Sequence, residues 1–161
     1  MKKLLLTVAA AALSSGLAFA DHHQKGEKID PAKANYKITI TGNDQMQYDK
    51  KEFAVVSGKS VALTFKNIGK LPVIGMGHNV VILKKGADVV KVAMDAAPNR
   101  PKFLPVKPEF QKQILANTQI LGPGESETIT FIAPAPGEYD YICTFPGHFG
   151  VMRGKMKVTA K

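Results

Sequence analysis

The chain has 161 residues, of which 45% are hydrophobic, with no tryptophan, one cysteine and a formal charge of +9. This is the length of a single domain, and the hydrophobic content is too high for a disordered chain. One cysteine excludes a zinc finger, an iron–sulfur cluster and a c-type haem attachment. The positive charges are dispersed along the chain, which argues against binding to nucleic acid.

The first 20 residues have the pattern of a secretory signal peptide. Lys2 and Lys3 form a basic start, residues 4–13 an apolar run, and Ala18-Phe19-Ala20 a cleavage site of small residues. We therefore expect cleavage after Ala20, export to the periplasm and a mature chain of 141 residues with a formal charge of +7. No other apolar run reaches the roughly 18 residues of a membrane helix, so we expect no membrane span.

Residues 21–34 are polar and charged without a hydrophobic period, which predicts a flexible leader before one domain at 35–161. Alternating apolar residues then predict strands at 36–40, 53–56 and 61–65, with turns at 42–44 and 57–59. Residues 79–83 are apolar after the first position, which is typical of a strand buried on both faces.

Residues 87–97 have apolar side chains at helical spacing and are followed by Pro98, which predicts one short helix. The next stretch, 98–108, contains four prolines and predicts a surface loop. Further strands are predicted at 128–132, 139–143 and 155–159. About seven short strands with one inserted helix indicate an all-β protein, a Greek-key β-sandwich.

One stretch near the C-terminus concentrates metal-binding donors. Cys143, His148 and Met152 offer a thiolate, an imidazole and a thioether within ten residues. The turn at Pro146-Gly147 allows them to converge at the end of the last two strands. His78 is a fourth donor at the start of the buried strand. Gly77 precedes it, and its missing Cβ lets the backbone carbonyl come close.

Two imidazoles, a thiolate and a weak thioether are the donors of a blue-copper electron-transfer site. The sulfur ligands stabilise Cu(I) and the imidazoles stabilise Cu(II). Zinc also accepts nitrogen and sulfur in tetrahedral sites, so donor type alone does not select the metal. A thioether is a poor ligand for zinc, and Met152 therefore favours copper. A bound metal would also protect a lone cysteine from oxidation in an exported protein.

The spacing from Cys143 to Met152, with four residues before His148 and three after it, resembles the copper loop of the azurins, which are bacterial cupredoxins. Residues 76–79 and 42–47 are similar to two further azurin segments, so the similarity covers about 36–161. It implies a cupredoxin sandwich of eight strands with a helical flap. It also implies one type 1 copper per chain, held by His78, Cys143 and His148, with Met152 and the Gly77 carbonyl as distant axial ligands.

The resemblance implies that Asn79 and Thr144 support the copper ligands, Asn79 by steadying the loop and by hydrogen bonding toward the sulfur. Three features depart from the azurin pattern. Tyr36 and Val61 stand where azurins usually have the two cysteines of a disulfide, so this disulfide is absent here. Val80 replaces a buried tryptophan. Asn67 replaces a pH-responsive histidine, so we expect no such switch.

Apolar residues flank the predicted ligands. They predict an exposed patch around the edge of His148, on which redox partners dock transiently, although ordinary core packing is the alternative. The patch comprises Leu71, Met76, Phe145, Pro146, Gly147 and Val151. The resemblance implies a c-type cytochrome, a nitrite reductase or a peroxidase as partner, and the positive charge favours an acidic one.

The sequence thus predicts an exported one-electron carrier that is not an enzyme. A periplasmic protein that binds or delivers copper is the alternative. A hydrolase built on Cys143 and His148 would lack an evident orienting acid and an oxyanion motif. A second Cu(II) site is a separate hypothesis, because cleavage would place a histidine third in Asp21-His22-His23. A solvated leader is the other interpretation of these histidines.

Overall fold

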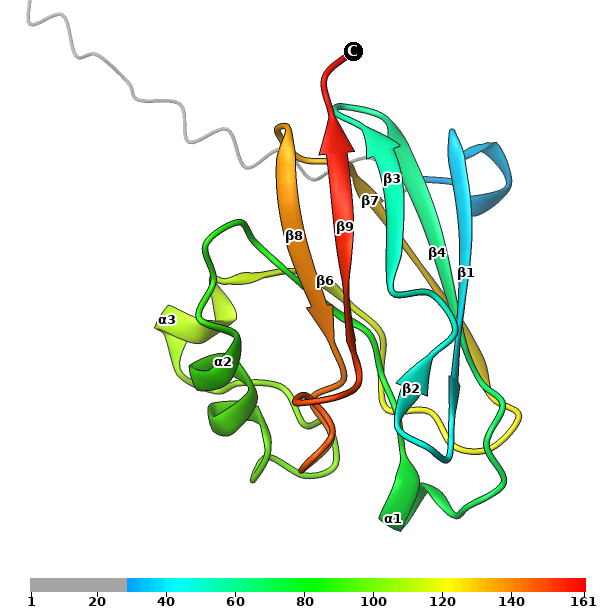
Figure 1. Ribbon diagram of the computed structural model, residues 1–161, viewed down its shortest axis with the longest axis vertical. Coiled ribbons are helices and arrows are strands. Elements are labelled where there is room, and N and C mark those ends of the chain that lie inside the picture. The colour runs from blue at the N-terminus through cyan, green and yellow to red at the C-terminus, as the bar shows by residue number, and fades with distance from the viewer. Residues whose placement is uncertain (1–28) are drawn as a thin grey trace, which may run out of the picture.

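Two β-sheets pack face to face in the computed structural model, which describes residues 29–161 (Figure 1). The first sheet has the order β2-β1-β4-β7, formed by Gln47–Tyr48, Tyr36–Asn43, Ser60–Asn67 and Ser126–Ile132. The second has the order β3-β9-β8-β5-β6, formed by Glu52–Val56, Arg153–Thr159, Gly137–Ile142, Val81–Leu83 and Ile114–Asn117. The expected signal peptide, most of the leader, and His22 and His23 lie outside the described residues.

The all-β Greek-key sandwich is confirmed, with nine strands in the described region if the two-residue β2 is counted. Strands β1 and β4 run parallel, as do β3 and β9, and the remaining pairs are antiparallel. Tyr36 lies directly opposite Val61 in the β1–β4 ladder. The positions that the resemblance associates with a disulfide are therefore neighbours across the parallel β1–β4 ladder.

The main core lies between the sheets, where alternate residues of each strand point inward. In β9 the buried positions are Gly154, Met156 and Val158, separated by more exposed lysines. Leu63 and Phe65 of β4 enter the same cluster and are fully buried. This period of two is the pattern that made the strands predictable.

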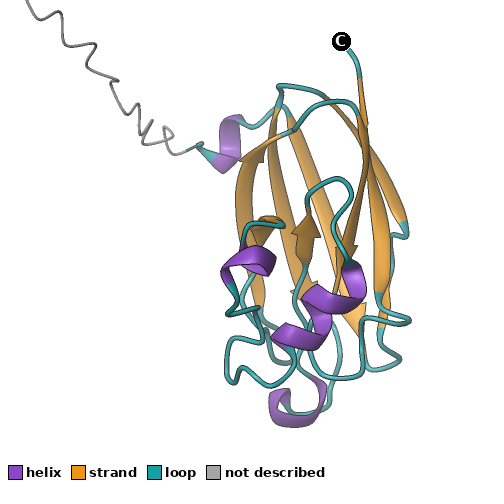
Figure 2. Cartoon of the chain, turned by 90° about the vertical axis from the view of Figure 1, so that its left-hand side faces the viewer, coloured by secondary structure: helices purple, strands orange, loops and turns teal. Residues whose placement is uncertain are grey.

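Strand β5 is buried on both faces, as predicted, although it spans only Val81–Leu83. Ile82 faces the main core, while Val81 and Leu83 belong to a second cluster with Val92 and Ala93 of helix α2 (Val89–Ala96). The Asp88 side chain caps α2 by accepting a hydrogen bond from the Lys91 N–H at 3.1 Å. Figure 2 shows short helices lying in front of this sheet, so the inserted helix is the cover that buries the outer face of β5.

Several elements differ from the sequence-based expectations. The short elements η1 (Pro31–Lys33), α1 (Val73–Met76) and α3 (Pro108–Gln111) were not predicted, and η1 lies within the expected leader. Strand β6 was also missed, because all four of its residues are half-buried and show no alternation. Gly42 and Asn43 end β1, and the turn begins only at Asp44. Among residues 29–161, no helix is both long and apolar enough to cross a membrane.

Candidate metal centre

The loop between β8 and β9 carries three of the predicted ligands and is closed at its base. The Cys143 N–H donates to the Met152 carbonyl at 3.0 Å, and the Met152 N–H donates to the His148 carbonyl at 2.8 Å. Between them, the His148 N–H donates to the Phe145 carbonyl at 3.0 Å. Gly147 has φ +82° within this turn, a conformation that favours glycine, so the predicted Pro146-Gly147 turn forms for the expected reason.

His78 is held by its backbone just before β5. It forms an isolated bridge with Leu121, in which the His78 N–H donates at 3.2 Å and the Leu121 N–H returns a bond at 2.8 Å. The buried side chain of Asn67 donates to the Leu121 carbonyl at 2.9 Å and accepts from the Gly69 N–H at 2.8 Å. Asn67 is therefore a structural residue beside the site, a role that the sequence analysis did not assign.

Three donor atoms converge in the interior at this end of the sandwich. His78 Nδ1 lies 3.2 Å from His148 Nδ1, and Cys143 Sγ lies 4.0 Å and 3.6 Å from these two atoms. All three ligand atoms lie within 4.8 Å of one another. His78 and Cys143 are fully buried and His148 is 3% exposed. The structure thus brings together the two histidines and the cysteine named from the sequence.

The protonation states of these residues suit a metal. Burial lowers the pKa of His78, and it lowers the pKa of His148 to about 4 with a further contribution from His78. Both imidazoles are therefore neutral near pH 7 and offer lone pairs. Burial raises the pKa of Cys143 to about 12, against smaller lowering by the backbone N–H groups of Asn79 and Phe145. The thiol is thus shielded and protonated until a cation displaces its proton.

His78 Nε2 is buried without a hydrogen-bond partner of ordinary geometry in the described part of the chain, although the Asn43 carbonyl lies close enough to raise the histidine pKa slightly. Both imidazoles have Nδ1, not Nε2, as the ring nitrogen near the thiol. Two imidazole nitrogens and a sulfur that face one point in the buried interior cannot all find hydrogen-bond partners among themselves. A thiophilic metal that also accepts imidazole fits this donor set.

Two glycines make room around the centre. A Cβ on Gly42 in β1 would lie 2.7 Å from Cε of Met152, which is fully buried. A Cβ on Gly77 would lie 2.6 Å from Ile120 Cγ2 and 2.9 Å from the Val73 carbonyl. The Gly77 backbone thus packs closely against Ile120 and Val73, while Gly42, which the sequence analysis placed in a turn, leaves room for the Met152 side chain. Metal ligation by Met152 and by the Gly77 carbonyl stays a prediction.

Asn79 and Thr144 tie the two ligand-bearing segments together. Asn79 Nδ2 donates to Thr144 Oγ1 at 2.8 Å, and the Thr144 N–H donates to Asn79 Oδ1 at 2.9 Å. Tyr48 donates its hydroxyl proton to the Asn79 carbonyl at 2.5 Å, and the Thr144 hydroxyl donates to the Phe103 carbonyl at 2.5 Å. These buried bonds fix the distance between the segment that contains His78 and the segment that contains Cys143.

The apolar residues around the site divide into exposed and buried groups. Leu71 and Val151 are 47% and 57% exposed, and Pro146 and Gly147 are also exposed. The prediction that Phe145 belongs to an exposed patch is wrong, because this ring is 6% exposed and packs between Phe103 and His148. Met76 is half-buried.

Two exposed apolar residues of α1 were not assigned to the patch from the sequence. Val73 and Ile74 are 44% and 72% exposed, and they line a groove that also includes Phe103 and Phe145. The feature of the sequence that could have pointed to them is the apolar run at 71–74. Without a predicted helix there, its direction could not be inferred.

Residues 34–159 match the family described as copper binding proteins, plastocyanin/azurin family. The chain is 38% identical to azurin of Achromobacter denitrificans over 130 residues, covering 78% of this chain and 86% of that protein. It is 40% identical to azurin of Bordetella pertussis over 131 residues, with coverage of 78% and 85%.

Solved structures of two other proteins are similar to this chain in fold and sequence. Dithionite-reduced auracyanin of Roseiflexus castenholzii superposes with a TM-score of 0.68 at 44% identity, covering 78% of this chain and 98% of that chain. The azurin Az-iso2 of Methylomonas sp. strain J has a TM-score of 0.68 at 34% identity, with coverage of 78% and 99%. With His78, Cys143 and His148 clustered as a single type 1 copper site requires, the chain belongs to the plastocyanin/azurin family of copper-binding proteins.

Proposed function

We propose that this protein is an exported blue copper electron carrier. His78 Nδ1, Cys143 Sγ and His148 Nδ1 hold the metal, and Met152 and the Gly77 carbonyl act as weak axial ligands. The observation that carries the proposal is the convergence of three buried donor atoms within 4.8 Å. Bound copper supplies one-electron chemistry by alternating between Cu(I) and Cu(II).

The protein's own residues favour electron transfer over substrate turnover. Burial of His78 and Cys143 leaves little access for a substrate, whereas His148, which is 3% exposed, offers an electron a short path to the surface. The hydrogen bonds between Asn79 and Thr144 and the closed base of the loop hold the donors in place. A frame that moves little between two charge states requires little rearrangement on transfer, which suits a carrier rather than an enzyme.

The apolar face at the metal end supports a transient redox partner. Leu71, Val73, Ile74, Pro146 and Val151 are exposed there, and Arg100 lines the groove beside Val73 and Ile74. An apolar centre with nearby positive charge favours a partner with a small apolar contact and acidic groups around it. A c-type cytochrome, a nitrite reductase or a peroxidase would satisfy this requirement.

The N-terminal pattern supports the place of action. Cleavage after Ala20 would release the chain into the periplasm, where Cu(II) and oxidising conditions are compatible with a buried thiol. Asp21-His22-His23 then remains a candidate second Cu(II) site. Titrating a Cys143→Ser protein with Cu(II) tests that site, and absence of residual binding near neutral pH would exclude it.

The decisive experiment adds Cu(II) to the metal-free mature protein and records its visible spectrum. We expect an intense thiolate-to-copper band that bleaches on reduction and returns on reoxidation. Cys143→Ser should abolish this band, while its circular dichroism shows whether the sandwich is retained. A colourless wild-type complex that passes its copper to a chelator would contradict the carrier and support copper delivery.

A further inference from the structure

Phe103 lies at the centre of the proline-rich loop 98–108, which neither the fold prediction nor the copper ligands explain. The loop is irregular as expected, but Phe103 is only 4% exposed, so it is not simply a surface loop. Its backbone has φ +47°, an uncommon conformation for a bulky aromatic residue. Such a conformation persists where the surroundings hold it, and here the Phe103 N–H donates to the Asn99 carbonyl at 2.7 Å.

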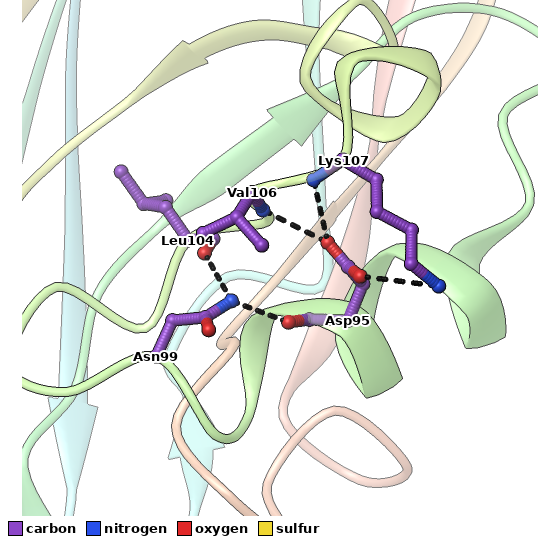
Figure 3. A network of polar contacts seen from close by, with 5 residues as sticks. All are labelled: Asp95, Asn99, Leu104, Val106 and Lys107. Carbon is purple, nitrogen blue, oxygen red and sulfur yellow. Dashed lines mark hydrogen bonds and ion pairs between the residues drawn. The ribbon is translucent and has the colours of Figure 1, made fainter.

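The loop is anchored to helix α2 on both sides of Phe103 (Figure 3). Oδ2 of Asp95 accepts from the Val106 N–H at 2.8 Å and from the Lys107 N–H at 3.1 Å. Asn99 Nδ2 donates to the Asp95 carbonyl at 2.5 Å and to the Leu104 carbonyl at 3.0 Å. Because α2 is itself packed on β5 and β8, the loop has a fixed position relative to the sandwich.

Phe103 makes two separate contacts with the loop between β8 and β9, which carries Cys143, His148 and Met152. Its carbonyl accepts the Thr144 hydroxyl bond, and Thr144 is adjacent to Cys143. Its ring centroid lies 5.0 Å from that of Phe145, which in turn lies 4.7 Å from the His148 ring. Phe103, a buried residue of loop 98–108, therefore contacts Thr144, which is next to Cys143, and Phe145, which packs on His148.

We propose that Phe103 is a positioning residue of the copper site, which sets the place of Phe145 and thereby restrains the His148 ring. The inference rests on the proposed copper function. In a close-packed interior, removal of the Phe103 ring leaves space into which Phe145 can move, and His148 loses the support on that face. Residues that orient metal ligands typically change metal affinity by about 10- to 100-fold when removed.

The test compares Phe103→Ala with Phe110→Ala in the mature protein. Phe110 is a matched control, because it is an aromatic residue of α3, just after the same loop, and packs on the cluster that contains Val92 and Ala93 of α2. In the described structure it makes no ring contact with Phe145 or His148. Phe103→Leu is measured in parallel, since it keeps much of the apolar volume and removes only the aromatic ring.

Two readouts separate positioning from general stability. In the copper-loaded protein, competition with a chelator should show a copper affinity about tenfold lower than that of wild type, or lower still, in both Phe103 variants, with a displaced thiolate-to-copper band. In the metal-free protein, the His148 amide, which is bonded to the Phe145 carbonyl, should exchange its hydrogen about tenfold faster. Phe110→Ala should lower the melting temperature without either change.

Equal copper affinity, band position and His148 exchange in wild type and Phe103→Leu would overturn the inference, as would equal responses in the Phe103→Ala and Phe110→Ala proteins. Failure of the wild-type protein to form the coloured complex would instead refute the proposed function. The hydrogen-exchange comparison in the metal-free protein would then still decide whether Phe103 positions His148.

Discussion

The centre of the sandwich and its metal-binding end are both buried, but they are built from different groups. In the centre, the two sheets meet through aliphatic and aromatic side chains such as Leu63, Phe65 and Ile82. At the metal end lie buried polar residues, among them Asn67, His78, Asn79, Thr144 and His148. The centre is stabilised by removal of apolar surface from water, and the metal end by specific partners.

Substitutions in these two regions should have different consequences. Apolar packing is nondirectional, so the centre tolerates changes of shape at a cost in stability but without loss of chemistry. At the metal end each polar atom needs a partner in a particular direction. A small displacement there should change how the ligands bind the metal, while the fold is retained. Stability and copper properties should therefore respond to different substitutions.

The largest effect on stability is expected in the centre. Leu63 is fully buried, and Leu63→Ala should lower the free energy of unfolding by about 2–5 kcal/mol. Denaturant unfolding of the metal-free and copper-loaded proteins should show the same loss, while the thiolate-to-copper band keeps its position. A displaced band would mean that the centre and the metal end are not energetically separate.

Gly42→Ala is expected to have a smaller effect on stability than Leu63→Ala and to change the reduction potential of the bound copper. The new Cβ would collide with Cε of Met152 and crowd the Phe65 ring, at a cost of about 1–3 kcal/mol. Displacement of the Met152 side chain should shift the reduction potential, measured by voltammetry, while copper remains bound. Gly150→Ala is the matched control, because a Cβ there meets no heavy atom within 4 Å. Identical potentials in wild type and Gly42→Ala would contradict an axial role of Met152.

The smallest effect concerns Asp95, away from both regions. Desolvation raises its pKa, but hydrogen bonds from the Lys107 and Val106 N–H groups and the Lys107 charge outweigh this and hold the pKa below the ordinary value of 3.8. Its carboxylate therefore stabilises the folded state above the unfolded pKa, and this contribution is lost as pH falls through the lower folded pKa.

Asp95→Asn should accordingly be less stable than wild type near neutral pH, and the difference should shrink in acid. Thermal unfolding of both proteins at about pH 6 and about pH 3 measures it. The visible spectrum reports at the same time whether loosening of the loop reaches the copper site. A difference in melting temperature that is the same at both pH values would argue against the lowered pKa.

Much of the fold was predictable because the inward and outward positions of β1, β4 and β9 differ in polarity. Strand β6 and the short elements α1 and α3 lack such a contrast and were missed. The metal donors were predictable because Cys143, His148 and Met152 lie on one short loop, whose closure requires little chain entropy. Phe145 was misplaced because an apolar residue in a loop can point either way.

By itself, the sequence determined the class of the protein. The alternation of apolar residues predicted the β-sandwich, and the donor types and their spacing in one loop predicted a copper site. Both are local properties of neighbouring residues. Only the tertiary structure decided which residues meet across long separations. Gly42 makes room for Met152, Asn67 holds Leu121 beside His78, and Phe103 packs on Phe145. The physical reason is that these contacts depend on how the two sheets, helix α2 and loop 98–108 pack together, and no local pattern encodes that geometry.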